Sequence, residues 1–125
     1  MATALYKHAL DAMLKGELDW VNDDVRGALV NTSTYTVDID NDSSYGDLDG
    51  VVDTTTSLQN KTVSGGKADS DDITFEDVTG TGDAVVLYKE GGVLIIYMDN
   101  IDGLPITSNS ADLVVRFHED GVFQL

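Results

Sequence analysis

The chain has 125 residues and carries 7 Lys and Arg against 23 Asp and Glu, which gives a formal net charge of −16. This length suits a single domain, residues 1–125, and excludes two independent cores. A surface this acidic repels phosphate backbones and anionic lipids, so we predict no nucleic-acid partner and no membrane partner. The absence of cysteine excludes disulfides, thiolate zinc sites and a cysteine nucleophile.

The excess of carboxylates has two interpretations. Many short Asp side chains with few cations are typical of a surface that stays soluble in high salt, which favours a halophilic source. An ordinary acidic surface is the alternative. The sequence predicts no secretory signal, because residues 1–10 lack a continuous apolar stretch followed by a cleavage site.

The N-terminal segment, residues 2–15, is predicted to form a short α-helix. Its apolar residues recur at spacings of three and four, which places them on one face: Leu5, Ala9, Ala12 and Met13. Thr3 is suited to the N-cap position, and Gly16 stands where the helix would end. Trp20 follows as an apolar anchor, and we interpret it as packing of the segment 1–20 against the rest of the domain.

Residues 24–125 are predicted to form a β domain. The strongest signal is a hairpin in which the apolar runs 84–89 and 93–99 flank Glu90-Gly91-Gly92. The nearly continuous apolar character of these runs predicts central strands that are covered on both faces. The other predicted strands are 24–31, 34–39, 51–56, 58–63, 73–78, 113–117 and 122–125, with turns at 79–82 and 118–121 and a polar loop at 40–50.

One helix followed by about eight strands predicts a mainly β fold. We expect a β-sandwich or a small β-barrel preceded by one short N-terminal α-helix. The last strand ends on the apolar Leu125 and is expected to be tied into a sheet. Gly103 and Pro105 predict a loop, which is also placed to form a contact surface at one end of the domain.

Asp38, Asp40 and Asp42 are candidate ligands of a structural cation such as calcium. Calcium takes about 6–8 oxygen ligands, and carboxylates at every second position resemble the start of a calcium loop. The EF-hand spacing fails, because its sixth position is Ser43 rather than Gly and its twelfth is Asp49 rather than Glu. A solvated acidic loop without a cation is the alternative.

The sequence contains no pattern typical of a catalytic site. Its two histidines, His8 and His118, have no metal-binding or paired spacing. There is no G-x-S-x-G nucleophile elbow and no glycine-rich phosphate loop. Pairs of carboxylates at glycosidase separation arise by chance among 23 acids. We therefore predict that the protein is not an enzyme and has no cofactor other than a structural cation.

Short apolar segments along the chain resemble small structural proteins of tailed bacteriophages. The matching pieces are ALY at 4–6, L-x-G-x-LDW at 14–20, VRGALV at 25–30, YTV at 35–37, KTV at 61–63, AVVLYK at 84–89, GLP at 103–105 and VF-x-L at 122–125. The resemblance covers most of the chain and implies a component of a virus particle. The chain departs from the pattern in its heavier Asp load and in a shorter hairpin at 90–92.

The resemblance implies a non-enzymatic structural protein located in the virion. We expect a capsid decoration or cement subunit on the outer surface, since an internal protein close to packaged DNA would be more basic. One alternative is a neck, tail or fibre-base component. Another, from a different class of protein, is an extracellular calcium- or carbohydrate-binding β module.

The expected partners are other virion proteins of the capsid, neck or tail, together with further copies of the chain in a homo-oligomer. We predict docking through four residues of the N-terminal segment, because they are apolar anchors in a charged sequence: Leu5, Tyr6, Leu14 and Trp20. The alternative is that this segment only covers the core of its own domain.

Overall fold

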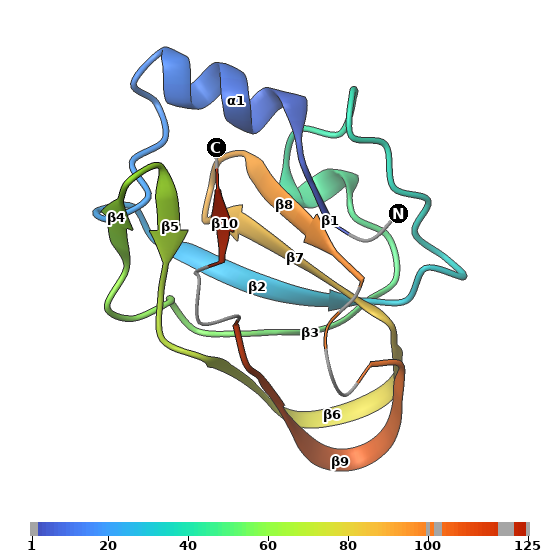
Figure 1. Ribbon diagram of the computed structural model, residues 1–125. Coiled ribbons are helices and arrows are strands. Elements are labelled where there is room, and N and C mark those ends of the chain that lie inside the picture. Colours follow the sequence, from blue (N-terminus) through green and yellow to red (C-terminus); the bar gives the residue numbers. More distant parts are fainter. Residues whose placement is uncertain (1–2, 100, 102–103, 118–121, 125) are drawn as a thin grey trace.

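The computed structural model describes residues 3–99, 101, 104–117 and 122–124. Within these residues the chain forms one α-helix and ten β-strands, so the fold is mainly β with one short N-terminal helix, as the sequence predicts. The strands lie in a five-stranded sheet, a three-stranded sheet and a two-stranded ribbon (Figure 1).

The five-stranded sheet lies at the centre of the molecule. Its strands run in the order β1 (Thr3–Leu5), β8 (Leu94–Met98), β7 (Ala84–Lys89), β2 (Val25–Val30) and β3 (Val51–Thr54), and neighbouring strands are antiparallel. The sheet is open, with β1 and β3 as its outer strands. Of the two predicted architectures, a β-sandwich therefore describes the fold better than a closed β-barrel. The predicted hairpin around Glu90-Gly91-Gly92 is confirmed as the connection from β7 to β8.

The N-terminal segment forms a strand before it forms a helix. β1 pairs with β8, with Thr3 opposite Met98, and α1 is limited to Lys7–Leu14. The predicted helix start at residue 2 and the N-cap role of Thr3 are therefore wrong. The first residues pair instead with the free edge of β8, and the extended Tyr6 is the N-cap. Gly16, at φ +74°, follows the end of the helix as predicted.

Residues 31–50 connect β2 to β3 as a long loop with one short 3-10 helix, η1 (Tyr45–Asp47). The predicted strand at 34–39 is wrong. The backbone N–H groups of Thr34 and Tyr35 both donate to the carbonyl of Asn31, at 3.0 and 2.9 Å, so the chain turns there. Tyr35 is buried, but it enters the core from this turn rather than from a strand.

A ribbon of β6 (Ile73–Gly82) and β9 (Ile106–Val115) lies under the five-stranded sheet in Figure 1. A Cβ placed on Gly27 of β2 would lie 3.0 Å from Ile73 Cδ1 and 3.5 Å from Phe75 Cζ. These β6 side chains therefore rest directly on the backbone of β2, and the ribbon covers part of one face of the sheet.

The last strands pair differently from the predicted final hairpin of 113–117 with 122–125. β9 pairs with β6, and β10 (Phe123–Gln124) pairs with β5 (Lys67–Asp69), so the hairpin is wrong. The predicted turn at 79–82 is also wrong, because these residues continue β6 opposite β9. The predicted turn at 118–121 lies outside the described residues.

The three-stranded sheet runs in the order β10, β5 and β4 (Thr62–Ser64). The prediction that the last strand is tied into a sheet is confirmed. The predicted strand 58–63 is wrong over most of its length, since only its last two residues belong to β4. The Leu58 N–H donates instead to the carbonyl of Val25 at 2.7 Å, beside β2.

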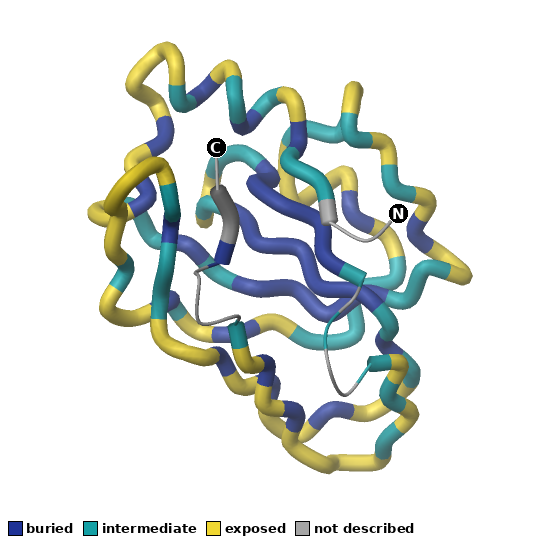
Figure 2. Tube along the Cα trace, in the orientation of Figure 1, coloured by how far each residue is buried: buried dark blue, intermediate teal, exposed yellow. Residues whose placement is uncertain are grey.

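One cluster of buried apolar residues joins α1, the loop 31–50 and strands of all three sheets. Figure 2 shows this buried region concentrated in the five-stranded sheet, with exposed residues along the helix, the outer loops and the ribbon. Among the described residues, no helix has the length and apolar character required to cross a membrane.

Candidate functional site

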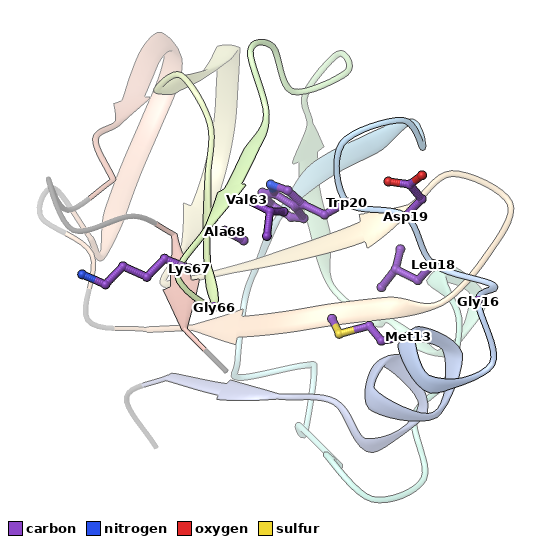
Figure 3. A pocket seen from close by; sticks show the side chains of 9 residues that line it. All are labelled: Met13, Gly16, Leu18, Asp19, Trp20, Val63, Gly66, Lys67 and Ala68. Atoms are coloured by element: carbon purple, nitrogen blue, oxygen red, sulfur yellow. The ribbon is translucent and has the colours of Figure 1, made fainter.

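An apolar groove with a volume of about 420 Å³ opens beside the end of α1, the segment 16–20 and the hairpin of β4 and β5 (Figure 3). The residues that line the groove come from these three parts of the chain: Met13, Gly16, Leu18, Asp19, Trp20, Val63, Gly66, Lys67 and Ala68. In Figure 3 the Trp20 ring and Val63 stand together, whereas the Lys67 side chain extends away from the other labelled residues. A cavity of this size is large enough for apolar side chains of a partner or for a small ligand.

Trp20 links the helix region to the three-stranded sheet. Its indole Nε1 donates a hydrogen bond to the carbonyl of Asp69 in β5 at 3.0 Å, and the residue is only 6% exposed. The chain reaches this position because Gly16 is left-handed and the Glu17 N–H returns to the carbonyl of Ala12 at 2.8 Å. Trp20 therefore has the packing role that the sequence predicts, and it lines the groove as well.

Two exposed apolar side chains belong to the elements that form the groove. Val63, in the outer strand β4, is 58% exposed, and Leu14, next to Met13 in the last turn of α1, is 88% exposed. A single exposed apolar side chain is ordinary, but Val63 lines an apolar depression, and Leu14 follows Met13, which lines it too. Burying each of them against a partner would contribute about 1.5–3 kcal/mol. This arrangement is suited to binding apolar groups of another molecule.

Charged contacts hold the segment between the groove and β2. Lys89 Nζ lies 3.1 Å from Asp23 Oδ2 and donates to the carbonyl of Glu17 at 2.8 Å. Lys61 Nζ donates to the carbonyl of Asp23. The hydrogen bond from the Asp19 backbone N–H, and then the contact with Lys89, hold the pKa of Asp23 below its usual value. Burial lowers the pKa of Lys61. Hydrogen bonds and an ion pair therefore fix the turn that carries this wall of the groove.

The four residues predicted to dock a partner lie in different environments. Leu14 is exposed, and Trp20 lines the groove. Leu5 is partly buried in β1. Tyr6 is fully buried, and its hydroxyl lies 2.7 Å from the hydroxyl of Tyr35, so it is not presented at the surface in this fold. A docking role stays a prediction, and the structure is compatible with it at Leu14 and Trp20.

Val63 and Ala68 line the groove although the sequence pattern does not single them out as functional. A signal was present for Val63, which is the one apolar residue between Gln59 and Lys67. Such an isolated valine in a polar stretch has no local partner. Its position beside Trp20 depends on the pairing of β4 with β5, which brings it to the helix region.

The candidate calcium ligands each have a different partner. Asp38 accepts hydrogen bonds from a neighbouring asparagine, and Asp40 Oδ1 lies 3.7 Å from Lys7 Nζ. Asp42 accepts the hydroxyl of Tyr35 at 2.6 Å. Among the residues that the structure describes, no group of three or more His, Asp or Glu is placed to hold a metal ion. A cation at these residues stays a prediction that calorimetric titration with calcium would test.

Tyr6, Tyr35 and Asp42 form a hydrogen-bonded chain that fixes the loop 31–50 to the N-terminal segment. The Tyr35 hydroxyl donates to Asp42, so it accepts the hydrogen bond of the Tyr6 hydroxyl. Burial is the largest cause that raises the pKa of both tyrosines. Both hydroxyls therefore remain protonated and continue to donate over the ordinary pH range.

Other residues singled out in the sequence lie away from the groove or outside the described residues. His8 is partly buried on α1 and does not line the groove. Pro105 is exposed immediately before β9. His118, Gly103 and Leu125 lie outside the described residues.

Comparisons with known proteins identify no family for this chain. A scan against protein-family models finds no matching family, and a search of the curated proteins finds no matching sequence. The groove and the surface charge are therefore the features of the chain that bear on its function.

Proposed function

We propose that the chain is a non-enzymatic structural subunit of a virion, a decoration protein that attaches to the outer surface of the capsid through the apolar groove. The observation that supports this proposal is the groove itself, lined by Trp20 and Val63 on a chain of net charge −16. An acidic surface keeps a protein soluble and limits contact with acidic neighbours. Burying the apolar side chains of the groove against a partner yields a favourable free energy. A neck, tail or fibre-base position is the alternative within this class.

The partner that fits the groove is a segment of another virion protein that presents an apolar side chain flanked by Lys or Arg. The net charge of −16 attracts such a segment and repels a second copy of the same chain. Lys67, the one basic residue of the lining, extends away from the other labelled residues (Figure 3). A homo-oligomer, as expected for symmetric virion parts, would use the outer strand β1, where backbone hydrogen bonds between copies offset this charge repulsion.

Immunogold electron microscopy tests the position in the particle. An antibody raised against the purified chain is applied to intact virus particles from the source culture and to particles opened by mild heating. Gold over the heads of intact particles supports a decoration protein. Gold confined to the neck or tail supports the alternative position. No gold on either preparation contradicts the virion assignment.

A binding assay tests the groove separately. Purified capsids that lack the protein are incubated with the wild-type chain or with Val63→Asp, and the retained chain is measured after sedimentation. We expect Val63→Asp to reduce retention at least about tenfold, because it places a charge in the apolar contact. Val114→Asp is the matched control, since this valine is 41% exposed in β9 and does not line the groove. Equal loss in both variants would exclude the groove as the attachment site.

A further inference from the structure

A polar cleft of about 550 Å³ lies over β2, β3 and β7, beside the β7–β8 turn. It shares no lining residue with the apolar groove. Three strands, the β7–β8 turn and the 3-10 helix η1 with its N-cap contribute its lining: Arg26, Ser44, Tyr45, Gly46, Thr54, Tyr88, Glu90, Gly91 and Gly92. Its combination of aromatic rings, hydroxyls and a guanidinium differs from the lining of the groove, and it points to a different ligand.

The cleft is assembled on rigid elements. Arg26 in β2 lies opposite Tyr88 in β7, so both side chains leave the sheet on the same face. On the other side, the Leu94 N–H donates to the carbonyl of Ser43 at 2.9 Å, and Ser44 forms an isolated bridge with Val93. These contacts join the loop that carries η1 to the start of β8. The two sides of the cleft are therefore fixed relative to each other before any ligand binds.

Tyr45 presents an exposed aromatic ring in this cleft. Its ring centroid lies 4.9 Å from that of Tyr88, with the planes inclined by 44°. Tyr88 is 4% exposed and supports the contact from the sheet, whereas Tyr45 is 40% exposed. A supported but accessible aromatic ring is a flat apolar surface at low entropic cost. It suits a ligand that has an apolar face and polar edges.

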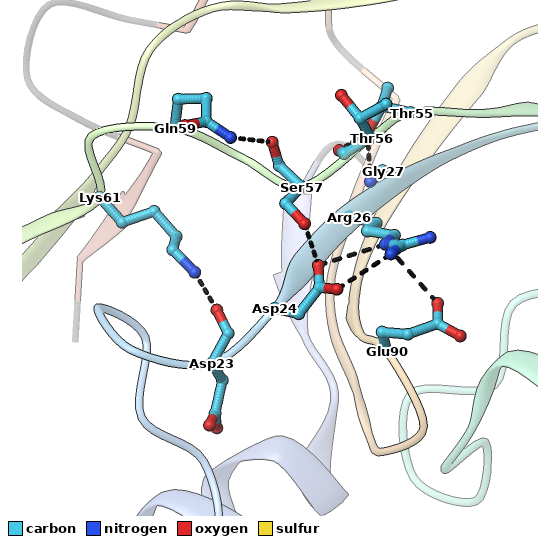
Figure 4. A network of polar contacts seen from close by, with 10 residues as sticks. All are labelled: Asp23, Asp24, Arg26, Gly27, Thr55, Thr56, Ser57, Gln59, Lys61 and Glu90. Atoms are coloured by element: carbon cyan, nitrogen blue, oxygen red, sulfur yellow. Dashed lines mark hydrogen bonds and ion pairs between the residues drawn. The ribbon is translucent and has the colours of Figure 1, made fainter.

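Polar groups also line this cleft, and Figure 4 shows Arg26 with its partners Asp24 and Glu90. Arg26 donates from Nε and Nη2 to the two oxygens of Asp24, at 3.2 and 3.0 Å. Ser57 Oγ also donates to Asp24, and the Arg26 Nε lies 3.8 Å from Glu90 Oε2. Among the residues that the structure describes, Nη1 of Arg26 has no hydrogen-bond partner, and the Glu90 side chain is half exposed as an acceptor. A donor and an acceptor therefore lie close together, which matches two adjacent hydroxyl groups.

The charge of the cleft selects among ligands. Arg26 is surrounded by the two carboxylates of Asp24 and Glu90, so the local balance is one positive against two negative charges. An anionic ligand is repelled by this balance. A neutral polyhydroxylated ring avoids that repulsion and uses the donors and acceptors of both kinds of group.

We propose that this cleft is a binding site for a neutral saccharide. The C–H face of the sugar ring packs on Tyr45, and adjacent hydroxyls hydrogen-bond to Arg26 and Glu90. The site is independent of the groove and of the proposed attachment to a virion, because neither depends on the residues of the cleft.

The experiment uses a printed array of neutral and sialylated oligosaccharides, probed with the purified biotinylated chain assembled on labelled streptavidin so that weak binding is amplified. We expect retention on neutral glycans and not on their sialylated counterparts. Tyr45→Ala should reduce the retained signal at least about tenfold, whereas Tyr45→Phe should keep most of it, because the ring and not the hydroxyl makes the stacking contact. Circular dichroism of each variant confirms that the fold is unchanged.

Val63→Asp serves as the control from the groove and should bind the array as the wild type does. The proposal is overturned if no neutral glycan retains the wild-type chain, or if only sialylated glycans do. It is also overturned if a correctly folded Tyr45→Ala binds as strongly as the wild type. Failure of Val63→Asp on capsids together with normal binding to glycans would show that the two sites act separately.

Discussion

The β7–β8 hairpin and the β6–β9 ribbon are both antiparallel pairs, but they are buried in different ways. In β7 and β8 every residue except Lys89 is buried, because other layers cover both faces of these strands. In the ribbon, buried and exposed residues alternate from Ile73 to Phe75, and most residues of β9 are exposed. The central pair is thus specified by continuous apolar sequence, and the ribbon depends on a few side chains that reach the sheet.

The largest expected effect comes from removing one of those side chains. Phe75 is fully buried and reaches the backbone of Gly27, so Phe75→Ala should lower the free energy of unfolding by about 3–5 kcal/mol. Leu87→Ala in the central pair should lower it by about 2–5 kcal/mol. Urea denaturation measures both. If Phe75→Ala lowers the free energy of unfolding much less than Leu87→Ala does, the ribbon does not share the core of the five-stranded sheet. Val114→Ala, at an exposed position of β9, is the control and should change stability by less than about 0.5 kcal/mol.

A close approach between the ribbon and β2 gives the second prediction. A Cβ at Gly82 would lie 2.7 Å from Leu29 Cδ1 and 2.8 Å from Leu29 Cδ2. Gly82→Ala should therefore lower the free energy of unfolding by about 1–3 kcal/mol through overpacking. Adding Leu29→Ala should give a combined loss smaller than the sum of the two single losses, because the clash is then relieved. Additive losses in urea denaturation would contradict this contact. Gly46→Ala is the control, since the nearest atom to its Cβ is 3.9 Å away.

The hydrogen bonds of the loop 31–50 give the third prediction. They allow the contribution of polar contacts to stability to be compared with that of apolar packing. Tyr35→Phe removes the hydrogen bond to Asp42 and leaves the buried Tyr6 hydroxyl without its acceptor. We expect a loss of about 1–3 kcal/mol in the free energy of unfolding, measured in urea. Tyr45→Phe, at an exposed ring, should be nearly neutral. If Tyr35→Phe leaves the free energy of unfolding unchanged, the hydrogen bonds that join Tyr6, Tyr35 and Asp42 do not contribute to stability.

Acid dependence gives a smaller effect, at the residue that precedes β2. The hydrogen bond from Arg26, and then that from Ser57, hold the pKa of Asp24 below its usual value, so this carboxylate binds protons less readily folded than unfolded. Its stabilising contribution is present above the unfolded pKa and is lost as the pH falls through the folded one. The melting temperature should therefore fall less between pH 6 and 3 in Asp24→Asn than in the wild type. Measurements in about 1 M NaCl suppress the general repulsion among the other carboxylates. An equal fall in melting temperature in both proteins would contradict the link between the ionisation of Asp24 and stability.

The smallest expected effect concerns the whole surface. Repulsion among the charges that sum to −16 should make the melting temperature at pH 7 rise with NaCl, by a few degrees between about 0.05 and 1 M. Differential scanning calorimetry measures this. A rise supports the halophilic interpretation of the composition, and a melting temperature independent of salt supports the ordinary acidic surface.

The sequence pattern predicts those elements that contacts between neighbouring residues determine. The β7–β8 hairpin followed from the apolar runs around Glu90-Gly91-Gly92, and the end of α1 followed from Gly16. The pairing of β6 with β9 and of β10 with β5 could not be predicted, because alternating residues are compatible with several partner strands. The spacing of apolar residues predicts a helix at Thr3–Leu5, because it carries no information about the free edge of β8, which is distant in the sequence.

The candidate sites show the same limit. Trp20 stood out in the sequence because a single tryptophan in a charged chain marks an apolar contact. Val63 and Tyr45 are each an isolated apolar residue in a polar segment, which is a weaker signal than a single tryptophan. Their roles depend on long-range pairing, which places Val63 near Trp20 and Tyr45 against Tyr88.

The pairing of β1 with β8 also has a consequence for the order of events during synthesis. Thr3 leaves the ribosome long before its partner Met98, at rates of about 5–20 residues per second, so roughly 5–20 s separate the two. During that time the edge of the central sheet has no first strand, and the first residues have no sheet to join. The N-terminal strand is therefore among the last parts of this sheet to take its place, although it is the first to be made.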